Sequence, residues 1–170
     1  YKKKNLCLSG GCIFNSSLNG KILNNSKFEN IYFSPNVGDA GGAIGSALYV
    51  AKKNNENINI NLNPYLGTKY DDEYVKKNIV EIIRENNAYQ ATYFENFDDL
   101  CEIVTNYLKN SSVVGWFQDR MEWGPRALGN RSILGDPRVK NMREIINLKI
   151  KKREEFRPFA PSVLEEEAKN

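Results

Sequence analysis

Twice in its first 52 residues the chain passes from a short apolar stretch through a glycine-rich turn into a helical stretch. The apolar stretches are 5–9 and 31–33, the turns are 10–11 and 38–42, and the helical stretches are 12–23 and 43–52. Strands that alternate with helices in this way are typical of an α/β layer, and we predict one here. Glycines in such turns let a ligand approach backbone N–H groups, although a Gly-Gly pair is as often only turn chemistry.

The remainder of the chain predicts further helices and strands. Residues 53–63 are rich in asparagine and are typical of a linker. Apolar residues recur at helical spacing in 71–87, where Asp71 or Asp72 is placed to cap the helix, and in 97–110. We expect strands at 91–94 and 113–117, a helix over 141–152, and an extended segment over 157–161, where prolines exclude a helix.

Residues 120–132, the arginine loop, read Arg-Met-Glu-Trp-Gly-Pro-Arg-Ala-Leu-Gly-Asn-Arg-Ser, and the Gly-Pro pair predicts a turn or loop. Arg120, Arg126 and Arg131 lie close together in this run. Arginine is a planar, permanently charged group that suits phosphate and carboxylate. Alternatively, these arginines form solvated ion pairs with acids, and the residues alone leave both interpretations open. The acids in question are Glu122, Asp136, Glu154 and Glu155.

Composition narrows the classes of function. The chain has no histidine, which excludes a His–Ser or His–Cys catalytic pair within it. Its cysteines, Cys7, Cys12 and Cys101, lack metal-site spacing and fit buried thiols of a reducing compartment. Residues 115–160 hold eleven Lys or Arg against six Asp or Glu, a local charge of +5, while the whole chain carries +3. A charge of this size does not by itself imply nucleic acid.

The sequence shows no clear membrane or export signal. No apolar run approaches the roughly 20 residues of a membrane helix. The N-terminus is basic and leads into an apolar stretch, but Ser9, Gly10 and Gly11 interrupt that stretch, so it makes a poor signal peptide. We therefore expect a cytoplasmic protein with no membrane partner. Position 1 is Tyr and not Met, which leads us to expect a fragment or a processed chain.

Five motifs in a fixed order carry a family resemblance. They are Leu-Ser-Gly-Gly-Cys-Ile-Phe-Asn at 8–15, Asn-Val-Gly-Asp-Ala-Gly-Gly-Ala-Ile-Gly-Ser-Ala at 36–47, Asn-Pro-Tyr-Leu-Gly at 63–67, and the stretches 118–132 and 151–162. Over most of residues 5–165 the chain resembles the O-carbamoyltransferases of nodulation-factor and antibiotic biosynthesis. The run Gly-Pro-Arg-Ala-Leu-Gly-Asn-Arg-Ser is the most specific part of the resemblance.

For residues 1–53 the resemblance implies the end of an actin-like ATPase-fold domain, related to the tRNA threonylcarbamoylation enzymes. The nucleotide-binding element of that domain corresponds to Gly10, Gly11 and Asn15, and its metal-binding aspartate corresponds to Asp39. The implied cofactors are ATP and a divalent metal in the complete first domain, with iron one candidate for the metal. From the residues alone, Asp39 is also suited to cap the helix that starts near Ala40.

A linker at 54–70 leads to residues 71–170, which resemble the start of a twisted-sheet domain like the threonylcarbamoyl-adenylate synthases. There carbamoyl phosphate and ATP give carbamoyl-adenylate and pyrophosphate, and the carbamoyl group then passes to a hydroxyl of a small-molecule acceptor, such as a sugar or an antibiotic-like compound. The positions that match catalytic residues are Arg126, Lys151 and Arg157. Those that match substrate-binding residues are Arg120, Asn130, Arg131, Ser132 and Arg153.

Asp119 departs from the family pattern, which usually has glycine there. A side chain at this position restricts the loop, and its carboxylate either opposes nearby phosphate or pairs with Arg120 or Arg126.

Other functions stay open. The chain also fits an RNA- or nucleotide-binding module without catalysis, an inactive structural fragment, or an actin-fold sugar kinase, although the last leaves 115–162 unexplained. The modest charge disfavours nucleic acid, and a homodimer is compatible with the resemblance. Because the family's domains begin before this chain and run on past it, we expect a fragment that is incomplete alone.

Overall fold

The computed structural model describes residues 3–59 and 62–168. The chain divides into two compact units, each formed from two stretches of sequence. Unit 1 comprises Tyr1–Thr68 and Met121–Leu128, and unit 2 comprises Lys69–Arg120 and Gly129–Asn170. The central part of the arginine loop therefore belongs to unit 1, and its two ends belong to unit 2. The predicted domain scheme of 1–53, 54–70 and 71–170 remains a prediction.

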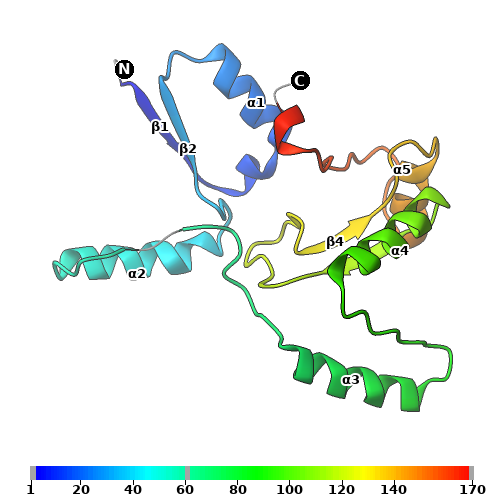
Figure 1. Cartoon of the computed structure of the whole chain (residues 1–170). Helices are drawn as coiled ribbons and strands as arrows, with labels where there is room; N and C mark the ends of the chain where they lie inside the picture. The colour runs from blue at the N-terminus through cyan, green and yellow to red at the C-terminus, as the bar shows by residue number, and fades with distance from the viewer. Residues whose placement is uncertain (1–2, 60–61, 169–170) are drawn as a thin grey trace. The chain divides into compact units, whose positions relative to one another are not determined.

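Unit 1 contains the predicted pair of strands. Strand β1 (Asn5–Leu8) pairs in parallel with β2 (Asn30–Phe33), with Asn5 opposite Asn30 and Leu8 opposite Phe33. Parallel neighbours need a crossover connection. In Figure 1 this connection is the short 3-10 helix η1 (Gly11–Phe14) followed by α1 (Ser16–Asn25). After β2 the chain turns through the glycines at 38–42 into α2 (Gly41–Lys53). The expected order of strand, turn and helix is confirmed.

Close backbone contacts explain two of the glycines in these turns. Gly10 has a φ of 108°, a conformation that favours glycine, and its N–H donates to the carbonyl oxygen of Val37 at 2.6 Å. A Cβ added to Gly41 would collide with the backbone carbonyl oxygen of Asn36. Gly42, the next residue, has open space at the same position. The turn before α2 therefore needs glycine for packing at 41 but not at 42.

Unit 2 is built from two capped helices and an antiparallel ribbon. Helix α3 (Asp72–Glu85) begins at Asp71, whose carboxylate accepts from the Tyr74 N–H, and α4 (Phe97–Lys109) begins at Asn96, whose amide oxygen accepts from the Asp98 N–H. Strand β3 (Val114–Phe117) pairs with β4 (Arg131–Leu134), with Phe117 opposite Arg131. Figure 1 shows α4 beside this ribbon. Next come α5 (Met142–Glu144), a π-helix η2 (Ile145–Ile150) and the 3-10 turn η3 (Glu165–Glu167).

One sequence prediction about unit 2 is wrong. Residues 91–94 form no strand, and Tyr93 is exposed with the Lys76 ammonium 4.4 Å above its ring. A strand needs a ladder partner, and the short apolar run has none among the described residues. The arginine loop is irregular over 120–130, as predicted, and its last two residues begin β4, a strand that the sequence did not predict. Mixed helix and strand agrees with an α/β class, while the actin-like and synthase-like assignments stay predictions.

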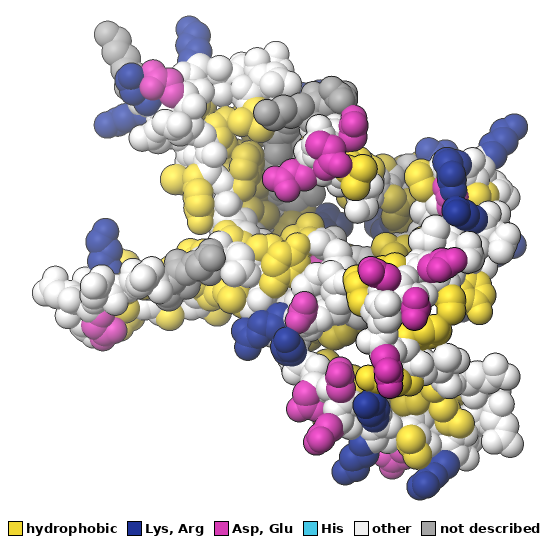
Figure 2. Space-filling model, viewed as in Figure 1, with side chains coloured by type: hydrophobic (Ala, Val, Ile, Leu, Met, Phe, Trp, Pro, Cys, Tyr) yellow, Lys and Arg dark blue, Asp and Glu magenta, His cyan; other side chains and the backbone are white. Residues whose placement is uncertain are grey.

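Few apolar side chains are buried in the described residues: Val37, Met142 and Ile146. The buried polar side chains are those of Asn36, Glu122, Asp136 and Asn147. Figure 2 shows hydrophobic side chains at the surface among the charged ones, and Tyr74, Val80 and Ile82 of α3 are at least half exposed. No helix in the described part of the chain is long and apolar enough to cross a membrane. Loop conformation here consequently depends strongly on buried polar contacts.

One buried acid forms an ion pair just after β4. The Asp136 carboxylate is 8% exposed and accepts from the Arg138 guanidinium at 2.6–3.1 Å and from the Arg138 backbone N–H at 2.9 Å. These hydrogen bonds lower the pKa of Asp136 from 3.8 to about 2, with the side-chain bonds to Arg138 the largest cause. The sequence offered Asp136 as an ion-pair partner for the arginines of the arginine loop, but it pairs with Arg138 of the following turn instead.

We predict that Gly41→Ala destabilises unit 1 by about 1–3 kcal/mol, because the new methyl group must displace the backbone at Asn36. Gly42→Ala is the matched control, and we expect it to be neutral or stabilising by up to about 1 kcal/mol, since alanine favours helix. Amide hydrogen exchange in β1 and β2 measures both. Equal effects of the two substitutions would contradict the assigned close contact.

We predict that Arg138→Ala raises the pKa of Asp136 from about 2 towards its ordinary value of 3.8. A lowered folded-state pKa contributes stability that is present above the ordinary pKa and lost as pH falls towards 2. The variant should therefore lose less stability than the wild type between pH 4 and 2. Carboxyl titration by NMR measures the pKa, with the exposed Arg143→Ala as control. An unchanged Asp136 pKa in Arg138→Ala would refute the pairing.

Candidate functional site

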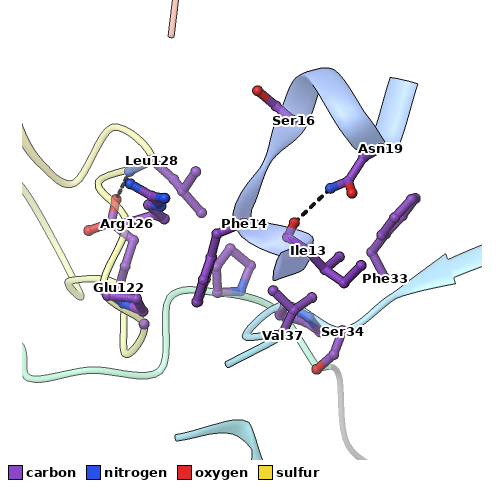
Figure 3. A pocket seen from close by; sticks show the side chains of 14 residues that line it. Ile13, Phe14, Ser16, Asn19, Phe33, Ser34, Val37, Glu122, Arg126 and Leu128 are labelled. Atoms are coloured by element: carbon purple, nitrogen blue, oxygen red, sulfur yellow. Dashed lines mark hydrogen bonds between the residues drawn. The ribbon is translucent and has the colours of Figure 1, made fainter. Parts of the chain in front are cut away.

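A cavity of about 210 Å³ lies within unit 1. Four segments line it: η1 with the start of α1, the end of β2 with the turn that follows it, Pro64, and the central part of the arginine loop. Figure 3 shows side chains from each segment converging on it. Its apolar walls include Ile13, Phe14, Phe33, Val37 and Leu128, and its polar groups are Ser16, Asn19, Ser34, Glu122 and Arg126. A mostly apolar cavity with a few converging polar groups is the usual form of a small-molecule site.

The arginine loop joins this cavity through backbone pairing with residues 63–68. The Gly67 N–H donates to the Met121 carbonyl oxygen, the Met121 N–H donates to that of Thr68, and the Trp123 N–H donates to that of Pro64, at 2.9–3.1 Å. A Cβ on Gly67 would lie 2.6 Å from the Met121 carbonyl oxygen, so glycine is needed for this approach. The motif at 63–67 therefore supports the arginine loop through backbone hydrogen bonds.

Arg126 stands at the rim of the cavity. Its guanidinium carbon lies 5.2 Å from the centroid of the Phe14 ring, within the range of a cation–π contact, and its side chain is otherwise exposed. The Phe14 ring also fills the space above Gly38, where an added Cβ would be 2.8 Å from it. An arginine with one face on an aromatic ring keeps its N–H donors for an anion, and the catalytic role of Arg126 stays a prediction.

The buried carboxylate of Glu122 holds the central part of the arginine loop in shape. Glu122 is 1% exposed, and its Oε1 accepts from the Leu128 N–H at 2.6 Å. Gly124 lies against Asn36, since a Cβ there would approach the Asn36 side chain to 3.3 Å. The sequence had offered Glu122 only as an ion-pair partner for arginine. No local sequence pattern indicates that this glutamate is buried. Because it is buried and accepts this hydrogen bond, Glu122 fixes the shape of segment 122–128.

One buried acceptor faces the cavity without a hydrogen-bond partner in the described residues. Asn19 donates through Nδ2 to the Ile13 carbonyl oxygen at 2.8 Å, and its Oδ1 is buried and unmatched (Figure 3). A buried amide oxygen of this kind favours a water or a ligand N–H. Asn19 was not among the residues that the sequence singled out as site candidates.

Two of the three residues predicted to bind nucleotide already make hydrogen bonds within unit 1. The Gly10 N–H is donated to Val37, and the Asn15 side chain caps α1 by accepting from the Leu18 N–H at 3.1 Å. Gly11 has open space around its Cα. The Nδ2 of Asn15 makes no hydrogen bond in the described residues and is left for a nucleotide, as is the exposed Gly11.

Asp39 is exposed at the turn before α2. Helix α2 begins after Ala40, and no side chain caps it, so the alternative of Asp39 as a helix cap is wrong. In the described part of the chain no three His, Cys, Asp or Glu side chains are grouped closely enough to hold a metal. A single exposed carboxylate does not fit a divalent cation, which takes several oxygen ligands, and we derive no step through a metal from these residues.

Unit 2 holds a second group of predicted site residues in Lys151–Arg157, which we call the basic loop. Lys151 and Arg157 are exposed and Arg153 is half-buried, with its guanidinium carbon 5.0 Å from the centroid of the Phe159 ring. The Arg157 Nε donates to the Glu154 carboxylate at 2.7 Å. The pKa of Glu154 is lowered, first by a hydrogen bond from its own backbone N–H and then by the one from Arg157.

Asn147 lies beneath the basic loop and is fully buried. Its Nδ2 donates to the carbonyl oxygens of Glu155 at 3.0 Å and Arg157 at 2.9 Å, and its Oδ1 accepts from the Arg153 Nε at 2.7 Å. The sequence prediction of a helix over 141–152 did not single it out.

The third group of predicted residues lies at the end of the β3–β4 ribbon in unit 2. The Asn130 amide accepts from Gln118 Nε2 at 3.2 Å and donates to the Arg120 carbonyl oxygen at 2.7 Å. The Ser132 Oγ accepts from the Gly129 N–H at 3.1 Å. Arg131 opens β4 opposite Phe117. Asn130 and Ser132 therefore hold the ends of the arginine loop in shape, and any substrate contact would come in addition.

Asp119 has a φ of 48°, a conformation that costs energy for a residue with a side chain and explains why glycine suits this place. Its carboxylate pairs with Lys69 at 2.9 Å, not with Arg120 or Arg126 as expected. Both partners are exposed, so the pair contributes little to stability.

Lys151, Arg153 and Arg157 are thus brought together in unit 2, while Arg126 belongs to the cavity of unit 1. Each group is a polyanion-binding candidate within its own unit. The two groups derive from the two specific motifs of the sequence, at 120–132 and 151–162.

Two family descriptions match the chain in order. "Carbamoyltransferase N-terminus" matches residues 1–48 and "Carbamoyltransferase C-terminus" matches residues 105–170. Nodulation protein NolO of Bradyrhizobium diazoefficiens is 41% identical over 170 residues, which is 96% of this chain and 29% of that protein. The 3'-hydroxymethylcephem-O-carbamoyltransferase of Streptomyces clavuligerus is 30% identical over 156 residues, 92% of this chain and 27% of that protein.

An uncharacterised protein of Synechocystis is 48% identical over 170 residues, 96% of this chain and 27% of its own length. The chain belongs to the carbamoyltransferase family, and the resemblance seen in the sequence is confirmed. The chain spans a little over a quarter of the length of these relatives.

We predict that Glu122→Ala frees segment 122–128, because the Leu128 N–H loses its buried acceptor. The expected loss is about 1–3 kcal/mol in the free energy of opening measured by hydrogen exchange at the Leu128 amide. Glu56→Ala, at an exposed glutamate of unit 1, is the control and should leave that amide unchanged. Unaltered Leu128 exchange in Glu122→Ala would show that the carboxylate does not hold the loop.

Proposed function

We propose that the chain supplies the anion-binding part of an enzyme that transfers a carbamoyl group to a hydroxyl of a small-molecule acceptor. The observation that carries the proposal is the basic loop, whose backbone at Glu155 and Arg157 and whose Arg153 guanidinium are held by one buried amide, within the stretch that matches the family's C-terminal part. Two relatives are named as nodulation protein and cephem O-carbamoyltransferase, which supports a sugar-like or antibiotic-like acceptor.

The proposed donor is carbamoyl phosphate and the proposed co-substrate is ATP. Water releases inorganic phosphate from carbamoyl phosphate, and the carbamate oxygen then attacks the α-phosphorus of ATP. Carbamoyl-adenylate forms and pyrophosphate leaves. The acceptor hydroxyl next attacks the carbamoyl carbon, and AMP leaves. The protein needs no nucleophile for this sequence, so the absence of histidine is compatible with it.

The basic loop has the chemistry that this donor step requires. Both substrates are polyanions, and negative charge grows on non-bridging oxygens during nucleotidyl transfer. Lys151 and Arg157 are exposed and available to neutralise that charge, and Arg153 presents its remaining N–H donors beside them. Losing one such donor typically costs about 3 kcal/mol of barrier. Arg126, fixed on Phe14, is proposed as a further cation of the same reaction.

For unit 1 we propose a nucleotide contact at Gly11, with Asn15 Nδ2 and Gly10 nearby, and Asp39 as one ligand of a metal. The open backbone at Gly11 supports the first part. We further propose that the protein acts in the cytoplasm.

The test is calorimetric titration of the chain with carbamoyl phosphate and then with ATP. We expect saturable binding that Lys151→Ala and Arg157→Ala each weaken about tenfold to a hundredfold, as for one charge-assisted contact. Arg84→Ala on α3 is the matched control, since Arg84 is an exposed arginine of the same unit outside the loop. Equal binding by all variants, or none by the folded wild type, would refute the donor site.

A further inference from the structure

We propose that Asn147 is a positioning residue for the basic loop, setting the geometry with which Arg153 and Arg157 meet a phosphate or carbamoyl phosphate group. The inference rests on the proposed function, because it assigns the loop's cations to anion binding. The new role is that of a buried side chain, which touches no substrate and acts through the loop.

Each of the three hydrogen bonds of the Asn147 amide is made to the basic loop. The two protons of Nδ2 go to the carbonyl oxygens of Glu155 and Arg157, and Oδ1 accepts from the Arg153 Nε. Two acceptors and one donor converge on the site, so the amide has a single consistent orientation. Aspartate has the same shape but would set a carboxylate oxygen against two carbonyl oxygens.

The backbone around Asn147 reinforces this arrangement. Asn147 lies in the π-helix η2, where the Lys151 N–H reaches back five residues to the Ile146 carbonyl oxygen at 2.8 Å. The Arg153 N–H donates to the Asn147 carbonyl oxygen at 3.0 Å, after Lys152 reverses the chain with a φ of 48°. The buried Ile146 and Met142 hold the helix from the other side. The π-helical turn therefore directs the Asn147 side chain into the interior, and the loop returns over it.

This geometry leaves the loop's cations ready for an anion. The Arg153 Nε is used by Asn147 and its plane lies over Phe159, so the terminal nitrogens are left without a hydrogen-bond partner in the described residues. Arg157 is paired with Glu154 only at the surface, with side chains about half exposed, and such a pair opens at little cost. Asn147 thereby fixes both the backbone of the loop and the direction of one guanidinium.

The alternative is that Asn147 only stabilises unit 2. A merely structural residue would lower stability when replaced and leave the affinity of the folded protein unchanged. A positioning residue also weakens anion binding by folded protein, and its effect shrinks once the group it positions has been removed. Affinity and stability must therefore be measured on the same variants.

The experiment compares Asn147→Ala, Asn147→Asp and Asn141→Ala in the full chain, with carbamoyl phosphate as the calorimetric probe. Asn141 is the control because it is exposed, starts the same helical segment and makes no capping bond. We expect Asn147→Ala and Asn147→Asp to weaken binding about tenfold to a hundredfold, as for a misplaced binding group, and Asn141→Ala to match the wild type. In an Arg153→Ala background the Asn147→Ala effect should be smaller.

The outcomes separate the two proposals. Absent binding by the wild type, or an Arg157→Ala variant that binds normally, overturns the proposed function. Wild-type binding lost in Arg157→Ala but retained by folded Asn147→Ala and Asn147→Asp overturns the positioning role alone. Should both Asn147 variants unfold, wild-type NMR decides: we expect slow solvent exchange of the Arg153 Nε–H, bonded to Asn147, and rapid exchange there would overturn the inference.

Discussion

The buried amide of Asn147 is the contact on which the shape of the basic loop depends. The seven residues of this loop hold four cationic side chains, those of Lys151, Lys152, Arg153 and Arg157, against two acids, and because like charges repel, another group must hold the loop in place. One neutral amide does so by matching two backbone carbonyls and one guanidinium at 2.7–3.0 Å. Because the amide carries no charge, it fixes the loop without neutralising it. The positive charge is therefore left available for an anion.

The same principle recurs in unit 1. Glu122 closes the arginine loop by accepting from the Leu128 N–H, and Asn36 holds the turn before α2 by accepting from the Gly38 N–H at 3.2 Å. Among the described residues few apolar side chains are fully buried, so such polar contacts determine loop shape to an unusual degree. A satisfied buried polar group specifies one conformation, because its alternatives leave an unmatched donor or acceptor.

Local signals predicted much of the fold, and non-local ones account for the rest. Asp71 and the 3.6-residue spacing of apolar residues predicted α3. The order of strand, turn and helix predicted β1, α1 and β2. Strand β4 was missed because its partner β3 lies beyond a loop of thirteen residues, 118–130, that reads as turn. Motifs located Arg126 and Arg157, yet not Asn147 or Glu122, since burial of a polar side chain depends on tertiary contacts that no short pattern records.

The central claim is that the basic loop, shaped from below by Asn147, binds the phosphate of the carbamoyl donor. The most direct test is an NMR titration of the wild-type chain with carbamoyl phosphate, following every backbone amide and arginine Nε–H. The account predicts that the largest shifts fall on residues 151–157, with the Arg153 Nε–H among them. Shifts spread evenly over the chain, or concentrated on α2 and α3 with the loop unmoved, would contradict it.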